Sequence, residues 1–127
     1  MAKIATDISQ SKTLAEILPP KSADMIWVLA NPDLPMIKAI AYEDSEKSKY
    51  YEVLPAWSLA ALLDVLPKKY YPIKDHETDL IIGKPKDKWC VLYWDTTGIQ
   101  HGEQTLEDNP LDACVNMIIK LNELNLL

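Results

Sequence analysis

The chain has 127 residues, of which 48% are hydrophobic, and its formal net charge at pH 7 is −6. This length and composition predict one globular domain with a hydrophobic core of its own. All 13 basic residues are lysines, and an acidic chain without arginine is a poor match for sequence-specific nucleic-acid binding or for an anionic membrane surface. We therefore expect no nucleic acid and no membrane among its partners.

The first half of the chain predicts a short helix followed by strands. Residues 1–12 are polar, and we expect a flexible N-terminus there, with a single α+β domain over residues 13–127. Thr13 and Glu16 have the spacing of a capping box, which indicates a helix near residues 13–18 that ends at two prolines. Apolar runs at 23–30, 36–42 and 50–54 predict strands, the first two as an antiparallel pair.

The second half predicts a helix, a hairpin and a longer helix. Ser58 is a good N-cap, and leucines at helical spacing indicate a helix over residues 58–66. Residues 70–73 are expected to be extended, and residues 79–83 and 88–94 to form a hairpin. Both faces of the segment 88–94 are apolar, which predicts a central strand covered on both sides.

The last helix has the clearest signals. Asn109 can cap it, Pro110 suits its first turn, and residues 110–124 carry an apolar stripe opposite a polar one. The predicted fold is therefore α+β: a mostly antiparallel sheet of about five strands packed by two main helices, with a short N-terminal helix.

The sequence gives no positive sign of a cofactor or metal site. Three glycines form no glycine-rich phosphate loop, and His76, Cys90, His101 and Cys114 include no closely spaced pair. Both cysteines lie in apolar runs, which is typical of buried reduced thiols. With no apolar segment long enough for a signal peptide or a membrane span, we expect a cytoplasmic protein without catalytic, cofactor or metal residues.

The aromatic residues favour protein binding. The chain has four Trp and six Tyr but no Phe, so every large aromatic ring carries a polar atom, as is typical of half-buried and interface positions. We predict Trp27, Tyr51, Trp57 and Tyr71 as contact residues for an unidentified protein partner. A homodimer, in which the partner is a second copy of this chain, is one form of this prediction.

Two other functions remain open at this point. One is a small enzyme that pairs Cys90 or Cys114 with His101 in a pocket. The other is an acidic decoy that occupies a nucleic-acid-binding protein, which would require carboxylates gathered on one face.

Short motifs spread over residues 13–127 resemble an uncharacterised family of small proteins from gut Bacteroidetes genomes and their prophages. The motifs are Ala23-Asp24-Met25, residues 54–59 with Leu62-Leu63, Trp89-Cys90-Val91 and residues 108–119. The family has no assigned activity, so the resemblance implies a cytosolic, mobile-element setting and no catalytic residues. The leading hypothesis is a non-enzymatic accessory protein of a prophage or mobile element that acts by protein–protein binding.

Overall fold

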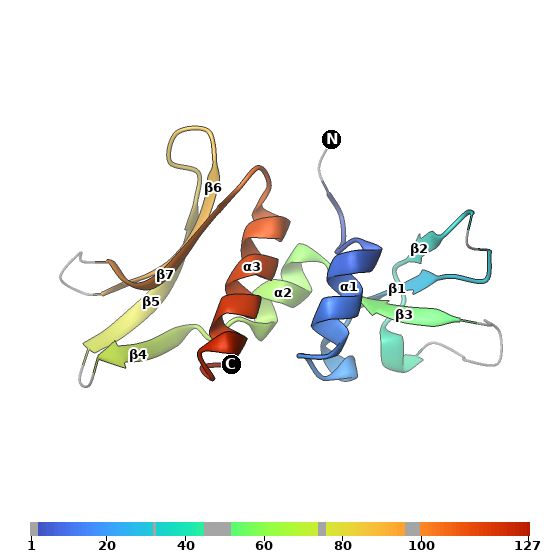
Figure 1. Ribbon diagram of the computed structural model, residues 1–127, viewed down its shortest axis with the longest axis horizontal. Coiled ribbons are helices and arrows are strands. Elements are labelled where there is room, and N and C mark those ends of the chain that lie inside the picture. Colours follow the sequence, from blue (N-terminus) through green and yellow to red (C-terminus); the bar gives the residue numbers. More distant parts are fainter. Residues whose placement is uncertain (1–2, 32, 45–51, 74–75, 96–99) are drawn as a thin grey trace.

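A computed structural model of the chain describes residues 3–31, 33–44, 52–73, 76–95 and 100–127, with the backbone alone for 69–73, 76–78, 95 and 100–103. The described residues form an α+β fold, as predicted. The molecule is elongated, with one sheet at each end and the helices between them (Figure 1).

Seven described strands form two antiparallel sheets, and not one sheet of about five. The smaller sheet has the order β2-β1-β3, with β1 (Met25–Val28), β2 (Met36–Lys38) and β3 (Val53–Ala56). The larger sheet has the order β4-β5-β6-β7, with β4 (Lys69–Ile73), β5 (His76–Gly83), β6 (Trp89–Asp95) and β7 (Gln100–Glu107). The helix after β3 leads the chain away from the first sheet, so the later strands pair only with one another.

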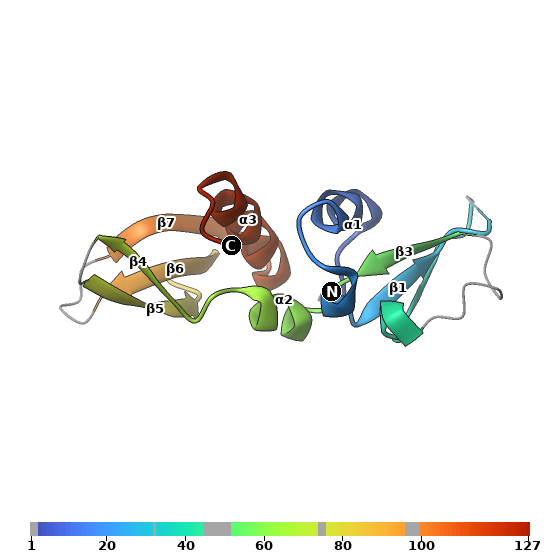
Figure 2. The same ribbon diagram turned by 90° about the horizontal axis from the view of Figure 1, so that it is seen from below.

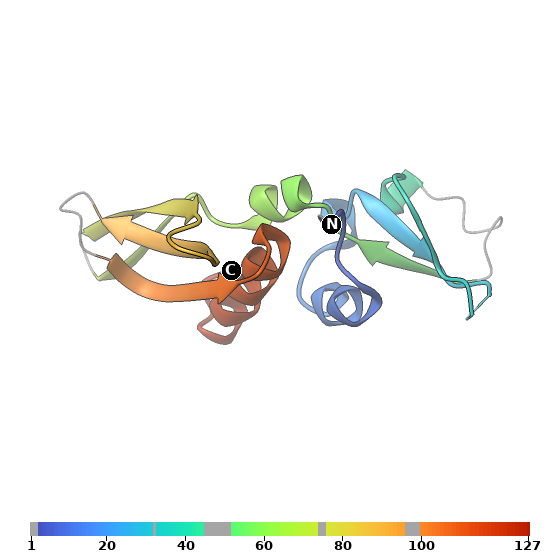
Figure 3. The same ribbon diagram turned by 90° about the horizontal axis from the view of Figure 1, so that it is seen from above.

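The helices are α1 (Ile8–Ala15), α2 (Leu59–Val65) and α3 (Pro110–Glu123), with 3₁₀ turns η1 (Pro20–Ser22) and η2 (Tyr42–Asp44). Helices α1 and α3 lie on one side of the molecule and α2 on the other (Figures 2 and 3). Among the described residues, no helix has both the length and the apolar content that a membrane crossing requires.

Helix α1 begins five residues before the predicted start. Asp7 accepts a hydrogen bond from the Gln10 amide at 2.7 Å, and the Asp7 amide donates to Gln10 Oε1 at 3.0 Å. These two bonds form a capping box, so Asp7 has the role that the sequence assigned to Thr13. The Thr13 hydroxyl donates instead to the Ser9 carbonyl within the helix. Residues 8–12, expected in a flexible N-terminus, are therefore helical.

The predicted hairpins are confirmed, whereas β7 was not predicted. Strands β1 and β2 pair antiparallel, as do β5 and β6. Strand β7 is largely polar, contains Gly102, and pairs with β6 across a register shift after Leu92. A polar edge strand with an irregular register lacks the strict apolar alternation by which strands are recognised in a sequence.

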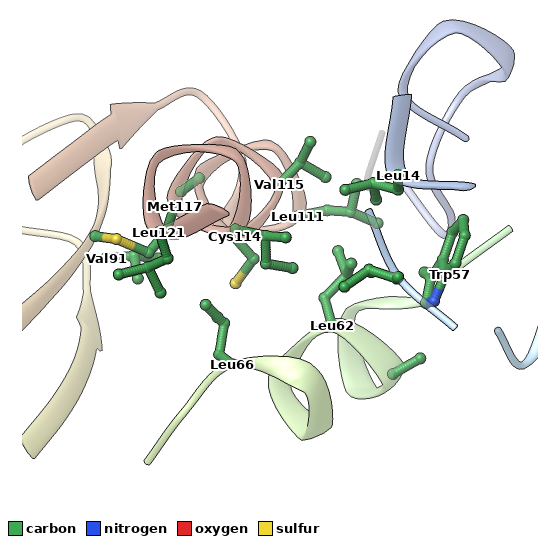
Figure 4. Packing of buried hydrophobic residues seen from close by; sticks show 14 of the residues in the cluster. Leu14, Trp57, Leu62, Leu66, Val91, Leu111, Cys114, Val115, Met117 and Leu121 are labelled. Atoms are coloured by element: carbon green, nitrogen blue, oxygen red, sulfur yellow. The ribbon is translucent and has the colours of Figure 1, made fainter. Parts of the chain in front are cut away.

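One buried cluster connects the two ends of the molecule. Helix α3 lies at its centre, with Val91 of the larger sheet on one side and Leu14 and Trp57 on the other (Figure 4). Leu62 of α2 and Leu66, which directly follows α2, complete it from below. The cluster shows why α3 is amphipathic: the larger sheet and both other helices pack against it, whereas the smaller sheet packs against α1.

Candidate protein-binding surfaces

The structure places Trp57 in the core and not on a binding surface. Its side chain has no exposed area, and its indole N–H donates to Ser22 Oγ at 2.9 Å. Trp27 is half-buried, and its indole N–H donates to the Thr6 carbonyl at 2.8 Å. The polar atoms of both rings therefore hold segments of this chain together, and Trp27 as a contact residue for a partner stays a prediction.

The two predicted tyrosines cannot be placed in the same way. Tyr51 lies outside the described residues. Tyr71 lies in β4, for which the structure describes only the backbone.

The cysteines are buried free thiols, as the sequence predicted. Burial raises the pKa of Cys90, and it raises the pKa of Cys114 to about 12. A thiol with a raised pKa is protonated at neutral pH, and a protonated thiol is a poor nucleophile. The side chain of His101, the proposed catalytic partner, is outside the description. Within the described part of the chain, no group of three or more His, Cys, Asp or Glu side chains could hold a metal ion.

The larger sheet has one covered face and one open face. Val91 and Tyr93 of β6 point into the core and have no exposed area. The alternate residues point away from it, together with their cross-strand neighbours on β5 and β7. The apolar part of this open face, which we call the outer face, consists of Ile81, Gly83, Cys90, Leu92, Trp94 and Leu106, and the polar residues Asp79 and Gln104 lie beside it.

The outer face is apolar and accessible. Ile81 is 41% exposed, Trp94 36% and Leu106 52%. The prediction that the segment 88–94 is covered on both sides is therefore wrong. The smaller sheet, which could have covered it, lies at the opposite end of the molecule (Figure 1).

A groove of about 380 Å³ runs between β7 and α3. The β7 residues that line it are consecutive, and the α3 residues recur at helical spacing. They are Gln104, Thr105, Leu106 and Glu107 on the strand and Asn116, Ile119, Lys120 and Glu123 on the helix. We call it the β7–α3 groove. The Thr105 hydroxyl donates to the Ala113 carbonyl at 2.8 Å and thereby fixes the strand against the helix.

The strand and the helix run in opposite directions along this groove. At one end, Asn116 Nδ2 donates to Glu107 Oε1 at 2.5 Å. Further along, Lys120 Nζ lies 3.5 Å from the Gln104 carbonyl oxygen. Glu123, one turn further, is exposed. The groove therefore passes from an amide–carboxylate pair to a lysine and ends at a carboxylate.

β7 is an edge strand, so one side of its backbone lacks a neighbouring strand in the described sheet. The Gln104 carbonyl faces this side, because the Lys120 ammonium reaches it from α3. Backbone groups alternate in an antiparallel ladder, so we infer that the amides of Gln104 and Leu106 face the groove as well. The groove thus presents backbone donors and acceptors of the kind that an added strand would pair with.

Comparison with protein-family models, curated proteins and solved structures finds no match for this chain. The resemblance to a Bacteroidetes and prophage family therefore stays a prediction.

The β7–α3 groove was not predicted because β7 was not predicted. The outer face had a signal in the sequence, which is the apolar row Cys90, Leu92 and Trp94. The segment 88–94 was predicted to be covered on both sides, but a binding face shows the same apolar row.

Proposed function

We propose that this chain is a non-catalytic protein-binding module that holds an extended segment of a partner protein in the β7–α3 groove. The observation that carries the proposal is the open edge of β7, with its backbone groups directed into a groove beside a helix. Strand addition at such an edge is a common mode of peptide recognition, in which backbone hydrogen bonds supply affinity and flanking pockets supply specificity.

The direction of β7 and α3 along the groove determines the orientation of the bound segment and the residue types it would carry. An antiparallel partner strand would run in the same direction as α3, so its C-terminal end would lie near Glu123. Its backbone N–H would bond the Gln104 carbonyl in place of Lys120. A basic residue near its C-terminal end would face the exposed Glu123 carboxylate, and an apolar residue would contact Ile119.

The state of the cysteines favours binding over catalysis, and it also favours a cytosolic location for the protein. The thiols that an enzyme would use have raised pKa values because they are buried. Both cysteines are free, which is the usual state in a reducing compartment.

The decisive experiment separates the backbone of β7 from its side chains. Linear peptides are selected from a random display library against the wild-type chain, and their affinities are measured by fluorescence polarisation. Gln104→Pro removes one backbone donor on an edge strand, where proline is tolerated, and it should weaken binding about tenfold or more. Gln104→Ala keeps the donor and should stay within a few-fold of wild type.

A second readout locates the bound peptide. Amide hydrogen exchange at Gln104 and Leu106 should slow on binding, because a strand in the groove takes up these donors. Selection of no peptide, or equal binding by Gln104→Pro and Gln104→Ala, would contradict strand addition.

A further inference from the structure

The outer face combines raised and hollowed parts. Trp94 stands at one end and Ile81 lies beside Leu92 in the middle, both with large exposed fractions. A hollow of about 270 Å³ extends from them over Gly83, Pro85 and Cys90. Gly83 leaves this space open, since a Cβ atom there would meet nothing within 4 Å. An exposed indole beside an apolar hollow is typical of an interface and unusual for a solvated sheet.

The two features are placed symmetrically about Leu92. Trp94 lies two residues to one side of it on β6, and Cys90 lies two residues to the other side. Each step of two residues spans about 7 Å along a strand. Gly83 pairs with Cys90 across the strands, so the part of the hollow over these two residues lies as far from Leu92 as the indole does.

We propose that the outer face binds a second copy of this chain and forms a two-fold homodimer. The two-fold axis passes at Leu92, between the two sheets and perpendicular to their strands. It brings Trp94 of each copy onto the hollow over Gly83 and Cys90 of the other. Contacts of this kind are reciprocal, which is the property of an isologous interface. The two faces would pack about 10 Å apart, as stacked sheets do.

Charge selects this orientation of the axis. The tip of the β5–β6 hairpin has three lysines and one aspartate, all exposed: Lys84, Lys86, Asp87 and Lys88. The proposed axis places the basic tips of the two copies at opposite ends of the interface. An axis parallel to the strands would bring the two basic tips together, which like-charge repulsion disfavours.

The size of the face sets the expected affinity. Strands β5 to β7 cover roughly 25 by 15 Å, which is less than the about 800 Å² per partner of a standard interface. We therefore expect a dissociation constant in the micromolar range. The outer face shares Leu106 with the β7–α3 groove, but the proposed dimer needs no peptide in that groove, so the inference does not rest on the proposed function.

The test is sedimentation equilibrium of the full chain from about 1 to about 500 μM, a range that brackets such an affinity. Wild type should pass from 14.4 kDa toward twice that mass. Trp94→Lys removes the indole and brings a positive charge near the basic tip of the other copy. Gly83→Leu fills the hollow of each copy. Each change should weaken association about tenfold or more.

The controls separate dimerisation from folding. Leu34→Lys makes the same kind of change at an apolar residue that is 68% exposed and outside the outer face, and it should associate like wild type. Circular dichroism should show that Gly83→Leu keeps the fold, because the structure leaves room for its side chain. A wild-type chain that stays at 14.4 kDa throughout, or folded variants that associate as well as wild type, would overturn the proposal. No peptide is present, so either result leaves strand addition at β7 to its own test.

Discussion

Asp112 joins three segments of the chain through its carboxylate. Its Oδ1 atom accepts from Lys3 Nζ at 2.8 Å and from Gln10 Nε2 at 2.7 Å, and its Oδ2 atom accepts from Asn109 Nδ2 at 2.7 Å. Burial by itself raises the pKa of Asp112, but the three hydrogen bonds and the Lys3 charge outweigh it. The pKa of Asp112 therefore lies below its ordinary value of 3.8.

The sign of this shift predicts acid sensitivity. A carboxyl with a lowered pKa in the folded state stabilises the fold above its unfolded pKa, and it loses that contribution as the pH falls through the folded pKa. Asp112→Asn should lower the free energy of unfolding by about 1–2 kcal/mol at neutral pH and flatten its decline below about pH 4. Urea denaturation of wild type and variant across this pH range measures both effects.

Asp108 supplies the matched control for Asp112. It pairs with Lys88, but its side chain is 82% exposed, so solvent screens the pair. Asp108→Asn should therefore show the same decline in the free energy of unfolding at acid pH as wild type. Equal losses in the two variants would show that Asp112 acts only as a surface charge.

At the scale of elements, the start of α1 depends on a single cap. Asp7 bonds the Gln10 amide and also pairs with Lys3 at 3.1 Å, so it anchors the helix where the chain enters it. Thr13 lies inside the helix and caps nothing there. The helix therefore begins where two reciprocal hydrogen bonds satisfy its free amides, whatever the spacing of later residues indicates.

This assignment predicts opposite outcomes at the two candidate caps. Asp7→Ala should lower the free energy of unfolding by about 1 kcal/mol, because an amide of the first turn loses its acceptor. Thr13→Ala should have almost no effect, since alanine suits a helix interior. Chemical denaturation followed by circular dichroism measures both. A larger loss of unfolding free energy for Thr13→Ala than for Asp7→Ala would instead support Thr13 as the N-cap of this helix, as the sequence predicted.

At the scale of the whole molecule, the elongated shape encloses a continuous core. Buried side chains pass from Trp57 and Leu14 near the smaller sheet, through α3, to Val91 and Tyr93 in the larger one. The Thr6 amide donates to the Trp57 carbonyl at 2.9 Å, and the Trp57 amide donates to Thr6 Oγ1 at 3.1 Å. These contacts make the two ends one cooperative unit, so we expect them to unfold together.

Trp57→Ala tests that continuity. It should lower the free energy of unfolding by about 3–5 kcal/mol, because it leaves a large cavity in the shared core. In wild type, circular dichroism and tryptophan fluorescence should report one coincident urea transition. Trp94→Ala removes the same ring from the exposed outer face and should cost much less. Two separate transitions, or equal losses in the two variants, would contradict a shared core.

The local structure of this protein follows from its amino-acid sequence. Ser58 and Asn109 begin the helices α2 and α3 as predicted, because N-caps act on amides within a few residues. The β5–β6 hairpin and the buried state of both thiols were also predicted, since these depend on apolar runs and nearby turns. The α+β class follows from such elements together.

Which surfaces are covered depends on tertiary contacts. Trp57 and Trp94 both look like interface residues in the sequence, yet one is fully buried and the other exposed. The difference arises because α2 leads the later strands away from the first sheet, so the outer face gains no second layer. Whether β7 adds to the sheet, and whether its edge stays open, depends likewise on pairing with β6 and packing on α3. Contacts between residues far apart in the chain control such outcomes, and local patterns carry little information about them.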